Sequence, residues 1–157
     1  MKHAVSLLIS LAFFGALPLG AFAEPHTFWF DELDLSLIHQ GWGKAVANKS
    51  VEKKPLHVGG KEYARGVGSH APGTIYIELD GSPGRFQAVV GVDDETKTRG
   101  SVSVTIYGDT KRLFQSEVLK GGQAPVSIDV DVTGVRRLVL MMGNGGDDNS
   151  FDHVDWC

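Results

Sequence analysis

The stretch TIYIELDGSPGRFQAVVGV, residues 74–92, decides the fold class of this chain. From Ile75 to Leu79 apolar residues alternate with polar ones, and the same alternation returns from Phe86 to Val92. A segment of glycine, serine and proline at residues 81–84 separates the two runs. Alternation with period two is typical of strands that bury one face, and Gly and Pro are typical of the turns between them. The stretch therefore predicts two consecutive strands of a packed β-sheet.

The same pattern continues on both sides of this stretch. Alternating runs predict strands over residues 102–106 and 128–132, and the run 138–142 is apolar on both faces, which predicts a central strand. Shorter runs predict further strands at residues 56–58, 113–119 and 151–156. Helical periodicity is nearly absent, and only residues 34–50 are expected to form a short helical turn or an irregular loop. The chain is therefore expected to fold as an all-β sandwich.

The first 23 residues form a separate segment. A basic start precedes an apolar run from Ala4 to Leu19, and Ala21-Phe22-Ala23 supplies the small residues of a cleavage site. A transmembrane anchor is the alternative, but this run contains Ser, Gly and Pro and is shorter than the roughly 20 apolar residues of a membrane span. We therefore expect a signal peptide over residues 1–23, one domain over residues 24–157, and a secreted, periplasmic or cell-envelope location.

Composition and charge narrow the class of protein. The chain is 42% hydrophobic and 22% charged, which is typical of a globular domain, and its single cysteine excludes an internal disulfide. The formal net charge is −4, and no Lys- or Arg-rich run is present. We therefore expect neither a nucleic-acid partner nor a membrane partner after cleavage of the leader. The free thiol of Cys157 could still form an intermolecular disulfide.

Six short motifs, in this order, carry a resemblance to a known family. They are WFDEL (29–33), GWG (41–43), PLHVGG (55–60), YARGVGSHA (63–71), VGVDDE (90–95) and DHVDW (152–156). Together they resemble the NPCBM/NEW2 domain, also called carbohydrate-binding module family 51 and associated with glycoside hydrolase family 98. The resemblance implies a jelly-roll-like β-sandwich of the galactose-binding-domain-like type. It also implies non-catalytic, lectin-like binding of galactose-type glycans and a bound calcium ion.

Four residues are candidates for sugar contact. Trp42 lies between two glycines, where its indole could stack on a pyranose ring, although it could instead close the end of the sandwich. His70 follows a glycine-rich strand and could exchange hydrogen bonds with hydroxyl groups, or could be a buried structural histidine. Asp93 and Asp94 end a predicted strand and are placed beside them if the strand ends converge. Trp29 and Trp156 are expected in the core, and His153 is expected to be a buried histidine held by carboxylates.

A second group of acidic residues follows the last glycine-rich turn. Asp147, Asp148 and Asp152 could supply the oxygen ligands that calcium prefers. The alternative is a pair of solvated acidic turns, because Asp is frequent in turns. The resemblance to the family favours calcium as a structural ion without identifying its ligands.

Two other functions are open at this point. A cell-envelope module for protein interaction would use the same sandwich without a sugar site. A small glycoside hydrolase would need two carboxyl groups, but nothing in the sequence places one in an apolar pocket, and no nucleophile motif is present. Binding without catalysis is therefore the expected function, with no attached catalytic domain within this chain.

Overall fold

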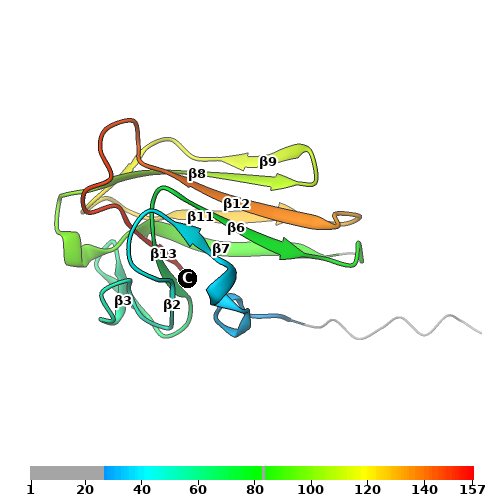
Figure 1. Cartoon of the computed structure of the whole chain (residues 1–157), viewed down its shortest axis with the longest axis horizontal. Helices are drawn as coiled ribbons and strands as arrows, with labels where there is room; N and C mark the ends of the chain where they lie inside the picture. The colour runs from blue at the N-terminus through cyan, green and yellow to red at the C-terminus, as the bar shows by residue number, and fades with distance from the viewer. Residues whose placement is uncertain (1–26, 83) are drawn as a thin grey trace, which may run out of the picture.

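The computed structural model describes residues 27–82 and 84–157, and the predicted leader lies outside this part of the chain. The described residues form two antiparallel β-sheets that face each other, with a small hairpin beside them (Figure 1). Three short 3-10 helices, η1 (Phe30–Glu32), η2 (Leu35–Leu37) and η3 (Asp94–Thr96), are the helical elements of this part. Within it, no helix is long and apolar enough to cross a bilayer.

The first sheet has six strands. Their order is β1-β6-β12-β8-β10, and β9 pairs with β8 outside this path. The strands are β1 (His39–Gln40), β6 (Gly73–Glu78), β8 (Ser101–Gly108), β9 (Lys111–Gln115), β10 (Leu119–Lys120) and β12 (Arg137–Gly143). As its two apolar faces predicted, β12 is a central strand, paired with β6 on one side and β8 on the other.

The second sheet has five strands in the order β11-β7-β13-β5-β2. They are β2 (Val46–Ala47), β5 (Val67–His70), β7 (Arg85–Val92), β11 (Val126–Asp131) and β13 (His153–Trp156). A separate hairpin consists of β3 (Leu56–Val58) and β4 (Lys61–Tyr63). A Cβ atom on Gly91 of β7 would collide with Val58, so this hairpin lies directly against the second sheet.

Apolar side chains from both sheets form the core between them. Every strand that the alternating pattern predicted is present, except that the run 113–119 is divided between β9 and β10. Trp156 is buried as expected, with 1% of its surface exposed. The core expectation is wrong for Trp29, whose side chain is 47% exposed. Residues that extend into the core from the two sheets include Val90, Val92, Val104, Ile106, Leu138, Leu140 and Val154.

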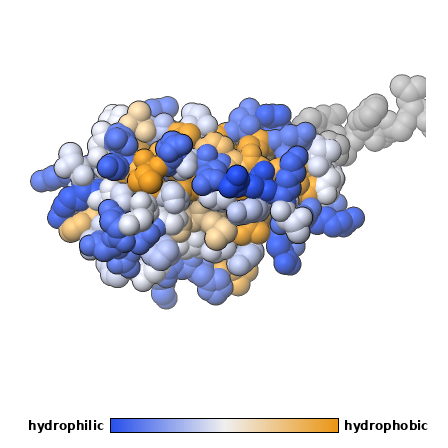
Figure 2. Space-filling model, turned by 90° about the horizontal axis from the view of Figure 1, so that it is seen from above, coloured by the Kyte–Doolittle hydropathy of each residue, from blue (hydrophilic) through white to orange (hydrophobic). Residues whose placement is uncertain are grey.

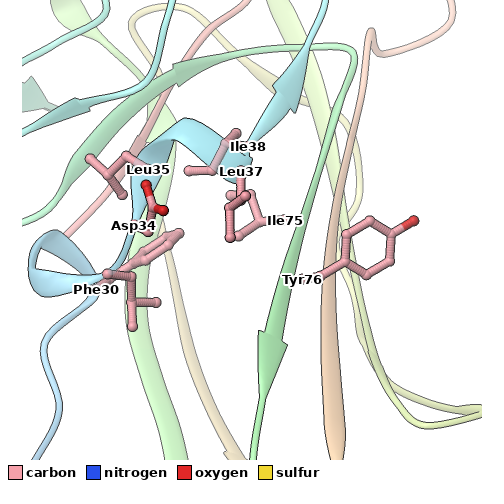
Figure 3. Close-up of a pocket in the computed structure, with 8 residues that line it drawn as sticks. Phe30, Asp34, Leu35, Leu37, Ile38, Ile75 and Tyr76 are labelled. Carbon is pink, nitrogen blue, oxygen red and sulfur yellow. The ribbon is translucent and has the colours of Figure 1, made fainter.

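The segment before β1 covers one edge of the first sheet. Figure 3 shows Ile75 of β6 on the side that faces Leu37 and Ile38, whereas Tyr76 points to the other side of the strand. A cavity of only about 20 Å³ remains between this segment and β6. On the face shown in Figure 2, hydrophobic residues reach the surface in small separate patches between hydrophilic side chains. The side chain of Tyr76, which points away from Ile75 across β6, is exposed (Figure 3).

Candidate functional site

Three rings from distant parts of the sequence meet at one end of the second sheet. The ring centroids of Trp42 and His153 are 5.9 Å apart with an interplanar angle of 6°, so the two rings are stacked. The imidazole of His70 lies 5.4 Å from Trp42 and 5.5 Å from His153. Trp42 is 52% exposed, whereas both histidines are buried. We call these three residues the aromatic cluster.

Strand pairing and a short loop bring the aromatic cluster together. His70 at the end of β5 is the register partner of His153 at the start of β13. The loop that carries Trp42 is fixed to the segment after β5, because the Gly41 amide donates to the Pro72 carbonyl at 2.8 Å. The side chain of Gln40 also donates to the Trp42 carbonyl at 2.6 Å. Hydrogen bonds to the backbone of this loop therefore hold Trp42 in place, while about half of its surface stays exposed.

A buried carboxylate fixes the second imidazole. Nδ1 of His153 lies 2.7 Å from Oε1 of Glu95, and both side chains are almost completely buried. The other oxygen of Glu95 accepts from Ser50 Oγ at 3.0 Å and lies 3.4 Å from Lys54 Nζ. These contacts orient the His153 ring parallel to the Trp42 indole. Glu95 was not among the site residues expected from the sequence, although it directly follows Asp93 and Asp94.

His70 has unused hydrogen-bonding capacity. Its side chain is buried, and its Nδ1 atom has no hydrogen-bond partner among the described residues. Burial lowers the pKa of the His70 imidazole below its ordinary value, and the neighbouring His153 acts in the same direction. The ring is therefore neutral at neutral pH, with one donor and one acceptor nitrogen. This buried imidazole, with one nitrogen that lacks a partner, is thus a polar group directly beside the half-exposed indole of Trp42.

The strand ends converge, because the Asp93 amide donates to the His153 carbonyl at 3.0 Å. The carboxylates of Asp93 and Asp94, however, bond to the β3-β4 hairpin and the η3 turn. Asp93 is buried, and its carboxylate accepts from the Glu95 amide at 2.7 Å. Asp94 accepts from the amides of Gly59 and Gly60 at 3.1 and 2.8 Å, and its carboxylate is 2.7 Å from His57 Nδ1. The hydrogen bonds of both carboxylates thus go to the backbone and to the hairpin. Their contact with a sugar remains an untested prediction.

Replacing Asp94 with alanine is expected to destabilise the domain by about 1–3 kcal/mol, because the hairpin turn loses three hydrogen bonds. Urea unfolding of the variant checks this value. Asp80→Ala is the matched control, since that exposed aspartate accepts only from its own turn at Ser82. Equal unfolding midpoints for the two variants would show that Asp94 does not hold the hairpin.

The predicted calcium residues surround the last loop before β13. Asp152 is completely buried, its Oδ1 accepts from the Ser101 amide at 2.8 Å, and its Oδ2 has no partner among the described residues. Both oxygens of Asp147 lie 2.9 Å from Ser101 Oγ. Burial raises the pKa of Asp152 to about 6, with contributions from the charges of Asp147 and Asp148. Residues 27–82 and 84–157 nevertheless contain no group of three His, Cys, Asp or Glu side chains positioned to hold a metal.

The acid with the most strongly raised pKa is inaccessible to a substrate. Burial, followed by the hydrogen bond and charge of Asp93, raises the pKa of Asp155 to about 10. A raised pKa is typical of a general acid. However, Asp155 has no exposed surface and lies under the hairpin with Asp93. Its properties are therefore those of a buried structural acid.

This fold and this cluster define a class of protein. A β-sandwich that presents a half-exposed indole beside two buried imidazoles offers an aromatic contact surface at one end of a sheet. Comparison with known families gives the assignment, since residues 26–157 match the NPCBM/NEW2 domain. The chain belongs to the NPCBM/NEW2 family of carbohydrate-binding modules, which confirms the resemblance read from the six motifs. It is a non-catalytic domain.

Two curated relatives are much longer proteins. Alpha-1,3-galactosidase B of Akkermansia muciniphila is 34% identical over 126 residues, which cover 78% of this chain and 16% of the relative. A putative endo-alpha-N-acetylgalactosaminidase of Renibacterium salmoninarum is 31% identical over 123 residues, covering 74% of this chain and 8% of the relative. The chain thus spans less than a fifth of the length of either protein.

Solved structures confirm the jelly-roll-like sandwich. The CBM51 module of a GH95 protein from Clostridium perfringens, determined in complex with methyl-galactose, is 27% identical. It superposes with a TM-score of 0.75 over 82% of this chain and 94% of that module. The tandem CBM51 modules of a family 98 glycoside hydrolase from Streptococcus pneumoniae share the fold at 18% identity, with a TM-score of 0.69 over 82% of this chain and 44% of theirs.

Proposed function

We propose that this domain binds a galactose-type sugar at the aromatic cluster. The single observation that carries the proposal is the half-exposed Trp42 indole, fixed beside the unpartnered nitrogen of the buried His70. An aromatic face suits the apolar C–H face of a pyranose, and a neutral imidazole suits its hydroxyl groups. The GH95 module crystallised with methyl-galactose and the galactosidase relative support the choice of sugar.

The proposal includes an exported protein that acts without chemistry of its own. The predicted leader is the basis for export, and the enzymes among its relatives support a role on extracellular glycans. The surface of the aromatic cluster is small, so a single sugar makes few contacts, and its hydroxyl groups must lose water. We therefore expect a dissociation constant between about 1 μM and 1 mM.

A glycan array probed with residues 24–157, followed by calorimetry with methyl galactoside, tests the proposal. Binding to galactose-terminated glycans, with competition by free methyl galactoside, is the expected result. The sugar proposal is wrong if the domain binds no glycan, with or without calcium. If it then also binds envelope proteins, and added galactose does not reduce this binding, the domain is a protein-interaction module.

We further propose that calcium binds at the loop of Asp147, Asp148 and Asp152 as a structural ion. The buried and unpartnered Oδ2 of Asp152 supports this, since an oxygen without a donor is a suitable cation ligand. Because three side chains do not converge there, further ligands would be backbone or hydroxyl oxygens. Ser101 Oγ and the Asn144 carbonyl, 3.3 Å apart, are the polar atoms next to Asp147.

Calcium at 100 times its dissociation constant is expected to stabilise the domain by about 2.7 kcal/mol, and EDTA is expected to remove this gain. The gain should be absent from Asp152→Asn and retained by Asp129→Asn, a surface aspartate paired with Arg85. Thermal unfolding with and without calcium measures the effect. Identical midpoints for the wild-type protein under both conditions would exclude a calcium site at this loop.

A further inference from the structure

A second aromatic surface lies at the opposite end of the β5-β13 pair. His70 pairs with His153 at one end, and Val67 pairs with Trp156 at the other, three residues or about 10 Å along the strands. A cavity of about 230 Å³ adjoins this second end. Its lining includes Trp29, Arg65, Phe86, Gln87 and Trp156. Because no residue of the aromatic cluster lines this cavity, it is separate from the site described above.

Two exposed aromatic side chains, Phe28 and Trp29, line this cavity, and the position of Trp29 is fixed by its neighbours. The guanidinium carbon of Arg65 lies 4.5 Å from the centroid of the Trp29 ring. Arg65 is itself held by Asp31, which accepts from both Nε and Nη2, and by Glu32 at 2.7 Å. The indole is thus ordered before any ligand arrives. Ordering a platform in advance reduces the entropy cost of binding.

Charge pairing around the cavity selects a neutral ligand. Arg65 is paired with two acids, and the other arginine of the lining, Arg85, lies 2.6 Å from Asp129. Neither guanidinium is therefore left as an unpaired cation for an anionic ligand. Among the other polar side chains of the lining, Thr27 offers a hydroxyl group, and Gln87 offers an amide that also hydrogen-bonds Asp129. An aromatic platform with neutral polar groups has the chemistry of a site for a pyranose ring.

The size of the cavity agrees with one sugar ring. Sites for drug-sized molecules occupy roughly 300–1,000 Å³, and this cavity lies just below that range. We propose that Trp29, Arg65 and Gln87 form a second carbohydrate subsite, which takes one neutral pyranose residue by stacking on the Trp29 indole. A multivalent glycan would then be held at two ends of one domain, with an avidity above that of either subsite alone. The proposal goes beyond the proposed function, since the subsite does not need Trp42.

The three tryptophans of the chain make a direct test possible, because each has its own indole N–H signal in a nitrogen-15 NMR spectrum. Trp42 reports on the aromatic cluster and Trp29 on the second subsite. Trp156 donates its N–H to Met142 Sδ in the core and reports on folding. The probes are methyl glycosides of galactose, glucose and N-acetylgalactosamine, with N-acetylneuraminic acid as the charged control. Two separate saturable shifts, of Trp42 and of Trp29, are the expected result.

Variants then separate the two subsites. In Trp42→Ala the dissociation constant from the Trp29 signal should change less than about twofold, and Trp29→Ala should leave the Trp42 titration equally unchanged. Tyr76→Ala, an exposed aromatic outside both sites, should alter neither. If Trp42 responds to the neutral sugars and Trp29 does not, the second subsite is disproved while the proposed function stands. If only Trp29 responds, the reverse holds, and if N-acetylneuraminic acid alone shifts Trp29, the inferred ligand class is wrong.

Discussion

Replacing Trp42 with alanine is expected to weaken binding of methyl galactoside at the aromatic cluster about 30-fold, equivalent to about 2 kcal/mol. The substitution removes the only half-exposed ring of the cluster and leaves two buried imidazoles that a sugar cannot stack upon. Because about half of the indole is exposed in the free domain, its loss should affect folding much less than binding. Isothermal titration calorimetry measures the change in affinity, and thermal unfolding measures the change in stability.

Matched variants show whether the loss comes from the stacking surface. Trp42→Phe keeps an aromatic face and should retain affinity within about fivefold, since the area is reduced but the geometry is kept. Glu95→Gln keeps the size of the side chain that orients His153 but removes its charge, and should weaken binding by a smaller factor than Trp42→Ala. If Trp42→Ala binds as tightly as the wild-type protein, the aromatic cluster is not the galactose site.

The sequence predicts the strands themselves, but it does not predict their order in each sheet. The alternation from Ile75 to Leu79 gave a correct strand because one face of β6 is buried and the other exposed. Nothing local shows that β12 pairs with β6 and β8, which lie far away in the sequence. The run 113–119 was divided because β9 and β10 pair with different parts of β8, and pairing partners are not encoded in a local period.

The candidate site was predicted in part for the same reason. Trp42 and His70 were selected from their glycine-rich surroundings, and the structure places them together. The contribution of His153 depends on its register with His70, across a separation that no local motif reports. The η3 turn directs the side chain of Glu95 differently from those of Asp93 and Asp94. The longer side chain of Glu95, in the middle of that turn, reaches His153, whereas the two aspartates face the hairpin.

Trp29 and Trp156 show the limit of residue type as a guide to burial. Both are tryptophans near polar residues in terminal segments of the domain, and both are expected in the core from the sequence. Trp156 lies on β13 in the middle of a sheet, where the strand directs its ring inward. Trp29 precedes the η1 turn at the edge of the domain, where contact with the Arg65 guanidinium satisfies one side of the ring without burying it. Departures of this kind are concentrated at sites with a function.

The carboxyl groups of Asp155 and Asp93 form a buried pair that should govern stability at alkaline pH. Both residues are at most 1% exposed, and both oxygens of Asp155 have no donor among the described residues. Burial first, and then the hydrogen bond and charge of Asp93, raise the pKa of Asp155 to about 10. Asp155 is therefore a protonated acid at neutral pH. In the unfolded chain the same group has a pKa near 3.9 and is ionised.

The sign of the pH dependence follows from proton binding. Between pH 4 and pH 10 the folded state holds one proton on Asp155 that the unfolded state has lost, so the free energy of unfolding falls as the pH rises. The slope is about 1.4 kcal/mol per pH unit. Asp155→Asn keeps the size of the side chain and cannot ionise. The difference in stability between variant and wild type should therefore move in favour of the variant by about 2.7 kcal/mol from pH 7 to pH 9.

Urea unfolding of both proteins at several pH values between 7 and 9 measures this difference in stability. The two proteins share every other titratable group, so the contributions of those groups cancel. Asp129→Asn is the control, because the pKa of Asp129 is lowered in the folded state, whereas that of Asp155 is raised. The hydrogen bond from Arg85 lowers the pKa of exposed Asp129, so its contribution is complete above pH 5 and is lost only in acid. That variant should run parallel to the wild type over the alkaline range. Parallel curves for Asp155→Asn as well would show that Asp155 holds no extra proton in the folded state and would overturn the assignment.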